Sequence, residues 1–270
     1  MTDFTFWRLF RRDLQNYFRI NRFHVLIVIG LFFIGAMTAD SQLSIQQLNY
    51  GVMDYFIMLF RGSYPFTETQ NGMFQLPLTW FILIYFCVYT AVIYPAQEQN
   101  GASTYYLLRA KSRTSWWLCK CFSLVVWVAF YFFLGFACLL GFILASGRPL
   151  RLSSALVPDQ TACVFLCSLP ILFAALLAVF CLCLCMFFNF WMAQAAAVTC
   201  LVLIAFVQIP YFPGNYSMLI RCRLLTPGGL EESTGIFLHV ILIALLWAAG
   251  SLFFQKMDIL PRKKGDINEN

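Results

Sequence analysis

Long runs of apolar residues recur along the whole chain, and they constrain its fold more than any single motif does. A helix needs about 20 such residues to cross a hydrocarbon core that is roughly 30 Å thick. Hydrophobic residues make up 61% of the 270 residues, more than a soluble core of this length can bury. The sequence therefore predicts an all-α integral membrane protein with six transmembrane helices, at 24–39, 76–94, 121–146, 161–188, 193–209 and 235–254.

Basic residues gather on one side of the predicted bundle. Thirteen of the 18 Lys and Arg residues lie before the first apolar run, between the second and third runs, or after the sixth. Because positive charge is enriched in cytoplasmic loops, this distribution predicts that both termini lie in the cytoplasm. Topology and anionic headgroups explain the net charge of +6, so membrane lipid, and no nucleic acid, is the expected partner of these cations.

The N-terminal segment 1–23 has the pattern of an amphipathic helix. On a helical wheel, apolar residues such as Trp7 and Phe10 fall on one half, and cations such as Arg11 and Arg12 fall on the other. Asp13 is the one residue that does not fit. Such a helix suits the inner headgroup layer, either as a generic anchor or with a specific docking role. We therefore expect an interfacial helix at 1–23, a six-span domain at 24–255 and a short cytoplasmic tail at 256–270.

Two segments on the predicted outer side contain apolar patches. The run YGVMDYFIMLF is short for a crossing and is interrupted by Asp54, so it predicts an outer interfacial helix. The segment 210–233 is broken by Pro and Gly, and we expect it to dip back into the outer leaflet. Asn215, Tyr216 and Ser217 form a glycosylation sequon there, but such triplets arise often by chance, and its use is left open.

The sequence lacks the motifs of several enzyme classes. No Gly is followed by Lys, so the phosphate-binding loop GxxxxGK[ST] is absent and the chain is not itself an ATPase of that class. Neither His24 nor His239 is followed by Glu, which excludes an HExxH metal site. No acid or imidazole is placed to activate a nucleophile. We therefore predict no catalytic residue and no enzyme activity in this chain.

The cysteines and the acidic residues narrow the function further. Cys181, Cys183 and Cys185 alternate along a predicted helix, so the middle one points away from the other two. We expect the eleven cysteines to pack as small apolar residues, without a metal site or a disulfide. An ion-coupled carrier holds a charge deep inside a span, and no acidic residue is expected there. This counts against a secondary carrier.

One long polar passage, YPAQEQNGASTYYLLRAKSRTSWWLCK, separates the second and third apolar runs. Gly101 begins a short stretch of small and hydroxyl residues that offers a turn and several N-caps. The residues YYLLRAKS that follow predict a short helix along the membrane surface. Its cations Arg109 and Lys111 would face the cytoplasm.

The order of residues in this passage carries a resemblance. That order is Glu98, Gly101, Leu107 with Leu108, Ser112 with Arg113, and Lys120. Together with the predicted topology and N-terminal helix, it resembles the permease of a type-2 ATP-binding-cassette (ABC) exporter. In that family an acidic residue ends span two, a Gly follows three positions later, and a Lys heads span three. Ala102 departs from the pattern, because Thr is common at that position in the family.

The resemblance implies that this passage holds a coupling helix, through which a separate ATPase moves the permease. Acidic residues on the ATPase are the expected partners of its cations. The implied ATPase-coupling residues are Glu98, Gly101, Arg109, Lys111 and Arg113. The alternative is that these residues are solvated loop charges that serve only to set the topology.

The resemblance also implies a permease domain that forms its path as a dimer, with itself or with a related chain, and binds two ABC ATPase subunits. ATP and magnesium would belong to the ATPase, and this chain would hold no cofactor. The expected cargo is amphipathic, such as a peptide, an antibiotic or a lipid-like molecule, and the expected location is the bacterial cytoplasmic membrane. The alternative function is a non-transport membrane scaffold or sensor subunit.

Overall fold

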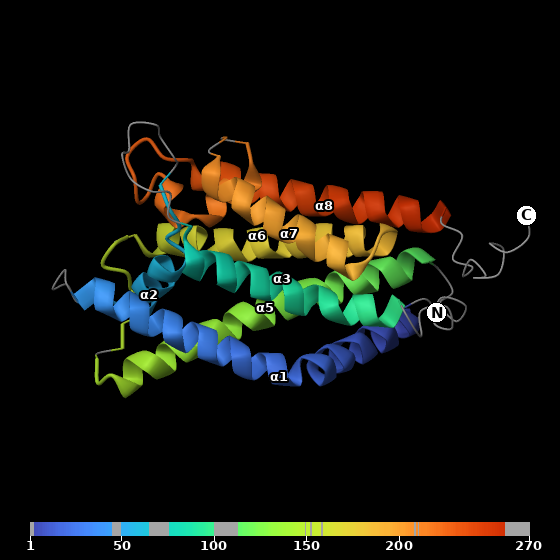
Figure 1. Ribbon diagram of the computed structural model, residues 1–270, viewed down its shortest axis with the longest axis horizontal. Coiled ribbons are helices and arrows are strands. Elements are labelled where there is room, and N and C mark those ends of the chain that lie inside the picture. The colour runs from blue at the N-terminus through green and yellow to red at the C-terminus, as the bar shows by residue number, and fades with distance from the viewer. Residues whose placement is uncertain are drawn as a thin grey trace, which may run out of the picture.

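The protein is a bundle of long helices in a computed structural model (Figure 1), which describes residues 3–44, 50–64, 76–99, 113–148, 150–151, 153–157, 159–207, 209 and 211–256. The described elements are α1 (Asp3–Ser44), α2 (Val52–Leu59), α3 (Leu78–Gln99), α5 (Arg113–Ala145), α6 (Gln160–Phe187), α7 (Phe190–Phe206), the 3-10 turns η1 (Pro213–Ser217) and η2 (Leu219–Arg221), and α8 (Glu232–Lys256). No strand occurs among these residues. The all-α class is therefore confirmed.

Five of the described helices are long and apolar enough to cross a membrane, namely α1, α3, α5, α6 and α8. The run predicted as the fifth span corresponds to α7, which is apolar but has only 17 residues, a length of about 25 Å. Figure 1 shows α7 running along the long axis beside the longer helices, with the start of α1 and the end of α8 at the same end. The membrane-protein class is thus supported, and the six-span topology stays a prediction.

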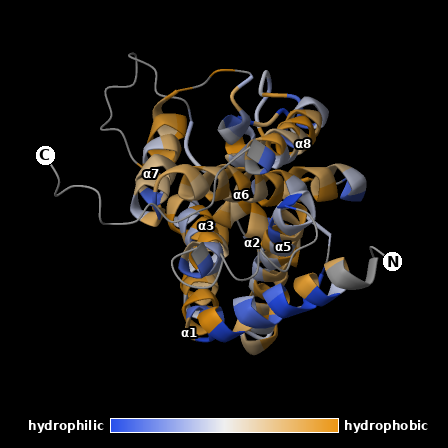
Figure 2. Ribbon diagram, turned by 90° about the vertical axis from the view of Figure 1, so that its right-hand side faces the viewer, coloured by the Kyte–Doolittle hydropathy of each residue, from blue (hydrophilic) through white to orange (hydrophobic). Residues whose placement is uncertain are grey.

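The N-terminal amphipathic segment is continuous with the first apolar run. The boundary that was predicted after residue 23 falls inside α1, which shows no break from Asp3 to Ser44. Figure 1 shows a bend along this helix. In Figure 2, which views the end where α1 begins, the first turns of α1 run across the end of the bundle and carry many hydrophilic residues.

The helix α6 forms the centre of the bundle, and α8 lies at its edge. In the most apolar window of each helix, 72% of the residues are buried in α6 but only 11% in α8. The apolar face of α8 is therefore available to lipid. Two side-chain caps fix the ends of this central region: Asp159 accepts a hydrogen bond from the backbone N–H of Thr161 at the start of α6, and Asn189 accepts one from Met192 at the start of α7.

The short helix α2 is confirmed, and most of its side chains are buried against the rest of the protein, while its interfacial position stays a prediction. Asp54, which seemed to interrupt the apolar run, is fully buried. Its carboxylate accepts hydrogen bonds from the backbone N–H groups of Gly51 at 2.8 Å, Ala155 at 2.9 Å and Leu156 at 3.1 Å. Hydropathy alone did not reveal the burial of α2, since apolar residues facing lipid and apolar residues facing protein look the same in sequence.

The segment after α7 folds back onto the bundle through η1 and η2 and contacts α6, α7 and α8. Arg221 holds it in place. Only 2% of this residue is exposed, and its guanidinium donates to the backbone carbonyls of Ile204 and Ala205 at 2.9 Å each and of Ser63 at 3.0 Å. Asn215 is also fully buried and hydrogen-bonded to Arg221, so the folded protein does not expose the sequon amide.

Candidate functional site

Four charged side chains from three helices meet at the end of the bundle where α1 begins. Arg12 and Asp13 come from α1, Glu98 from the last turns of α3, and Lys120 from the second turn of α5. The Lys120 ammonium lies 2.9 Å from a carboxylate oxygen of Asp13 and pairs directly with Glu98. Arg12 bridges the same two carboxylates at 3.0 Å each. We call these four residues the charge network.

The charge network is buried and electrically balanced. The side chains of Asp13 and Lys120 are each 1% exposed and that of Glu98 is 7% exposed, whereas Arg12 reaches solvent at 26%. Two cations face two carboxylates, so their attraction opposes the cost of removing these charges from water. Loss of any one partner would leave one uncompensated charge in the network, and breaking a buried pair in this way typically costs about 3–5 kcal/mol.

Tyr94 lies at the middle of this network. Its hydroxyl donates to Asp13 at 2.7 Å and accepts a hydrogen bond from Lys120 at 3.0 Å. The three N–H donors of Lys120 are therefore matched by three acceptors, on Asp13, Glu98 and Tyr94. The ammonium also lies 4.6 Å from the centre of the Tyr94 ring, a cation–π distance. Lys120 is thus held in one position from several directions.

A proline in α3 extends the contact between α1 and α3. Pro95 has no N–H, so the carbonyl of Ala91, four residues earlier, loses its helical partner. The hydroxyl of Tyr17 donates to that carbonyl at 2.9 Å. One turn further along α1 from Tyr17, the Asn21 side chain donates to the carbonyl of Thr90 at 3.1 Å. Side chains of α1 therefore take up backbone acceptors of α3 beside the charge network.

The predicted ATPase-coupling residues separate into two groups. Glu98 lies inside the charge network, and Arg113 is an exposed residue at the start of α5 whose guanidinium lies 3.4 Å from the carbonyl of Gln255 near the end of α8. Gly101, Arg109 and Lys111 lie outside the described residues. The interpretation of Glu98 as a solvated loop charge is therefore wrong, because its carboxylate is buried and paired twice.

The four residues proposed for the interfacial helix also have different surroundings. Arg12 belongs to the charge network, and Arg11 is exposed. Trp7 is 60% exposed, while the ring of Phe10 packs against Phe122 of α5 with 5.5 Å between ring centres. The helix thus has one side bound to the bundle and another side open to its surroundings.

Sequence reasoning missed the roles of Asp13, Tyr94 and Lys120. Asp13 gave a signal, because it was the one residue that did not fit the polar face of the helical wheel. Lys120 was expected just before the third span, which gave no sign of its burial; it lies seven residues inside α5 and is fully buried. Asp13 and Glu98 also fall within apolar membrane-span candidates, although both lie near one end of the bundle and away from its middle.

The site is a set of buried ion pairs that holds three helices together. Among the described residues, no group of three or more His, Cys, Asp and Glu side chains is arranged to hold a metal ion. Comparisons with protein families, with curated proteins and with solved structures found no match. The functional proposal below therefore depends on the geometry of this chain and on the residue order noted in its polar passage.

Proposed function

We propose that this chain is the permease subunit of a type-2 ABC exporter and that the charge network transmits movement from its coupling segment, residues 100–112. One observation carries the proposal: Glu98, two residues before that segment, pairs with Lys120, eight residues after it. Asp13 and Arg12 bind the same pair to α1. A force on the segment would therefore act on α1, α3 and α5 together.

The network suits this role because its partners lie on different helices and are buried. Separating any one of the ion pairs would leave a charge without its partner in a poorly solvated environment. Because this is costly, the three helix ends would keep their relative positions and move as one body. In the proposed mechanism, two ATPase subunits grip Arg109, Lys111 and Arg113 through acidic residues. ATP-driven closure of that pair would then shift the coupled helices and open the pathway outward.

The remaining parts of the proposal follow from the same assignment. The path would lie between two permease copies, a homodimer or a pair with a related chain, in a bacterial cytoplasmic membrane. ATP and magnesium would bind to the ATPase. The cargo would be amphipathic, and the permease chain itself would carry out no chemical step.

The deciding experiment is gentle purification of the tagged chain from its native membrane, followed by mass spectrometry of the copurifying proteins and an ATPase assay. We expect a stoichiometric ATPase subunit that is lost when Arg109, Lys111 and Arg113 are replaced by Glu. Replacing the exposed Arg151 and Arg223 by Glu is the matched control, because both lie at the other end of the bundle. A chain that purifies alone without ATPase activity, while the host's ABC ATPases are detected elsewhere, would favour the scaffold or sensor function instead.

A further inference from the structure

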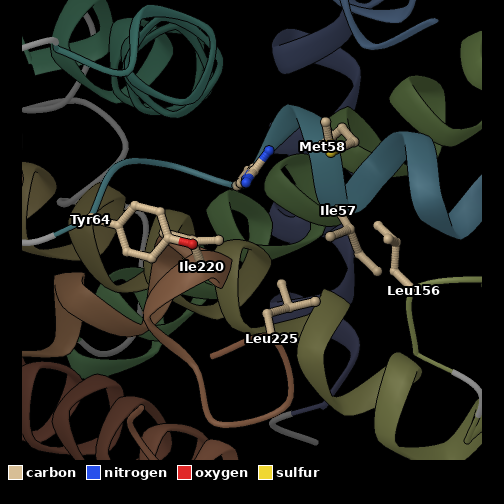
Figure 3. Close-up of a pocket in the computed structure, with 7 residues that line it drawn as sticks. Ile57, Met58, Tyr64, Leu156, Ile220 and Leu225 are labelled. Atoms are coloured by element: carbon tan, nitrogen blue, oxygen red, sulfur yellow. The ribbon is translucent and has the colours of Figure 1, made fainter. Parts of the chain in front are cut away.

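A small pocket lies at the end of the bundle opposite the charge network. Its volume is about 160 Å³, similar to a cavity of ~150 Å³ that can hold benzene. Figure 3 shows that side chains from α2, from the segment after it, from the loop before α6 and from the η2 region surround this hollow. The lining residues are Ile57, Met58, Arg61, Tyr64, Leu156, Ile220 and Leu225.

The backbone fixes the walls of the pocket. The N–H groups of Leu219 and Ile220 donate to the carbonyls of Phe60 and Arg61 at 3.0 and 2.9 Å, which joins two walls that are distant in sequence. Gly62 follows with a φ of 75°, a conformation that L side chains rarely adopt. A Cβ on Gly62 would also lie 2.5 Å from the Cβ of Met218. The pocket is therefore part of the folded chain and does not depend on a partner.

The pocket has one cation among its apolar walls, and that cation differs from the other buried or half-buried arginines at this end. Arg148 pairs with Asp40 at 2.8 Å, and Arg221 is surrounded by carbonyl oxygens. Arg61 is half-buried, and its side chain has no hydrogen bond or ion pair within the described part of the chain. A half-buried guanidinium gains strongly from an anion, because charge-assisted hydrogen bonds are about twice as strong as neutral ones.

We propose that this pocket binds an anionic amphiphile through the end of one alkyl chain. The end of its alkyl chain would enter between Ile57, Leu156 and Leu225, and its carboxylate or phosphate would bind Arg61. The hydroxyl of Tyr64, a residue that is 52% exposed, supplies a second donor at the rim. Two sources offer this chemistry: an anionic lipid of the surrounding leaflet, or the cargo, in which case the inference rests on the proposed export function.

The test is photolabelling of the full chain in phosphatidylcholine nanodiscs, without ATPase or ATP, by octanoate that carries a diazirine at its chain end. We expect labelling to concentrate on peptides that contain 57–64, 156 and 220–225. Arg61→Gln should raise the half-saturating concentration about tenfold, whereas Arg223→Gln, an exposed arginine at the same end, should leave it unchanged. The matched alcohol probe, which lacks the charge, should label wild type as weakly as octanoate labels Arg61→Gln.

A pocket-filling variant separates this site from general contact with lipid. Leu156→Trp should abolish labelling of the pocket peptides, and Leu225→Phe serves the same purpose if the first variant does not elute as a folded protein. Competition by phosphatidylglycerol in the nanodisc would identify a lipid as the occupant, and undiminished labelling would identify a free amphiphile. Equal labelling of Arg61→Gln and Arg223→Gln, or labelling spread along α8, would overturn the proposal. Because no ATPase is present, that result is independent of the copurification experiment.

Discussion

The two ends of the bundle neutralise buried charge in different ways. At the end where α1 begins, Lys120 and Arg12 are balanced by Asp13 and Glu98, so charges on three separate helices depend on one another. At the opposite end, Arg221 and Asp54 are buried without an ion pair. Most of their hydrogen-bond partners are backbone carbonyl and N–H groups, and each has one side-chain partner, Asn215 or Ser154.

This difference predicts different responses to substitution at the two ends. Arg221 binds carbonyls of the last turn of α7, where acceptors lack helical partners and a cation is favoured by the helix dipole. Burial lowers the pKa of Arg221 to about 10, which still leaves it charged at neutral pH. A backbone partner remains when the side chain at its position is substituted, so its hydrogen bond does not depend on the identity of that residue. Side-chain partners on different helices make the stability of each helix end depend on the others, and the following substitutions test that contrast.

The largest effect is expected for Arg221→Ala, which leaves the carbonyls of Ile204 and Ala205 buried without donors. We expect the free energy of unfolding to fall by about 4 kcal/mol, and Arg221→Lys to lose less because the charge remains. Chemical unfolding in mixed micelles measures both. Exposed Arg223→Ala should change little, and a similar loss for Arg223 would contradict the role assigned to Arg221.

Lys120→Met should lower the free energy of unfolding by about 3 kcal/mol, because Asp13 and Glu98 would then share only Arg12. Adding Asp13→Asn should recover part of this loss, with an interaction energy of about 1–3 kcal/mol in a double-mutant cycle. No single second substitution should rescue Arg221→Ala, whose principal partners are backbone groups. Additive effects of the Lys120 and Asp13 substitutions would remove the proposed difference between the two ends.

Tyr17→Phe should cost about 1 kcal/mol, because it removes the donor for the carbonyl that Pro95 leaves free. In a Pro95→Ala background the same substitution should cost much less, since the restored N–H of residue 95 can bond to Ala91. The same unfolding assay compares the two backgrounds. An unchanged effect of Tyr17→Phe in both would mean that the hydroxyl does not compensate for Pro95.

The smallest effect is expected at Asp159, which is exposed and caps α6. Hydrogen bonds from Thr161 lower the pKa of Asp159 below its usual 3.8. Because the folded-state pKa is the lower one, its stabilising contribution is present at neutral pH and disappears as the pH falls through that value. Asp159→Ala should therefore lower the melting temperature slightly at pH 7, and this difference from wild type should vanish at acidic pH. Asp159→Asn, which keeps a capping oxygen, serves as the control.

The sequence was sufficient to predict the class of the fold and the positions of its long helices. Apolar run length is a local property, so the helices at α3, α5, α6 and α8 could be located closely. The sequence analysis missed that the amphipathic segment and the first apolar run form one helix, although no residue near position 23 stops a helix. Burial of α2 was also missed, since hydropathy does not distinguish a lipid environment from a protein interior.

The charge network could be predicted only in part. Glu98 and Lys120 stood out from their order in the polar passage, but their pairing joins residues that are 22 positions apart. Asp13 and Lys120 are farther apart still, on helices whose contact depends on the whole bundle. The anomaly of Asp13 on the helical wheel showed that it had an unusual environment, but it did not identify the partner.

The burial of Asn215 has a practical consequence for experiments that use glycans as reporters. If the chain is synthesised in a system with oligosaccharyltransferase, the enzyme must reach the sequon before Arg221 and the end of α7 close around it. A glycan at this position would also prevent that closure, because the Asn215 side chain fits against Arg221 and the carbonyl of Ile209. Glycosylation of Asn215 would thus mark molecules that missed their native fold, and the unmodified fraction would report how quickly this region assembles.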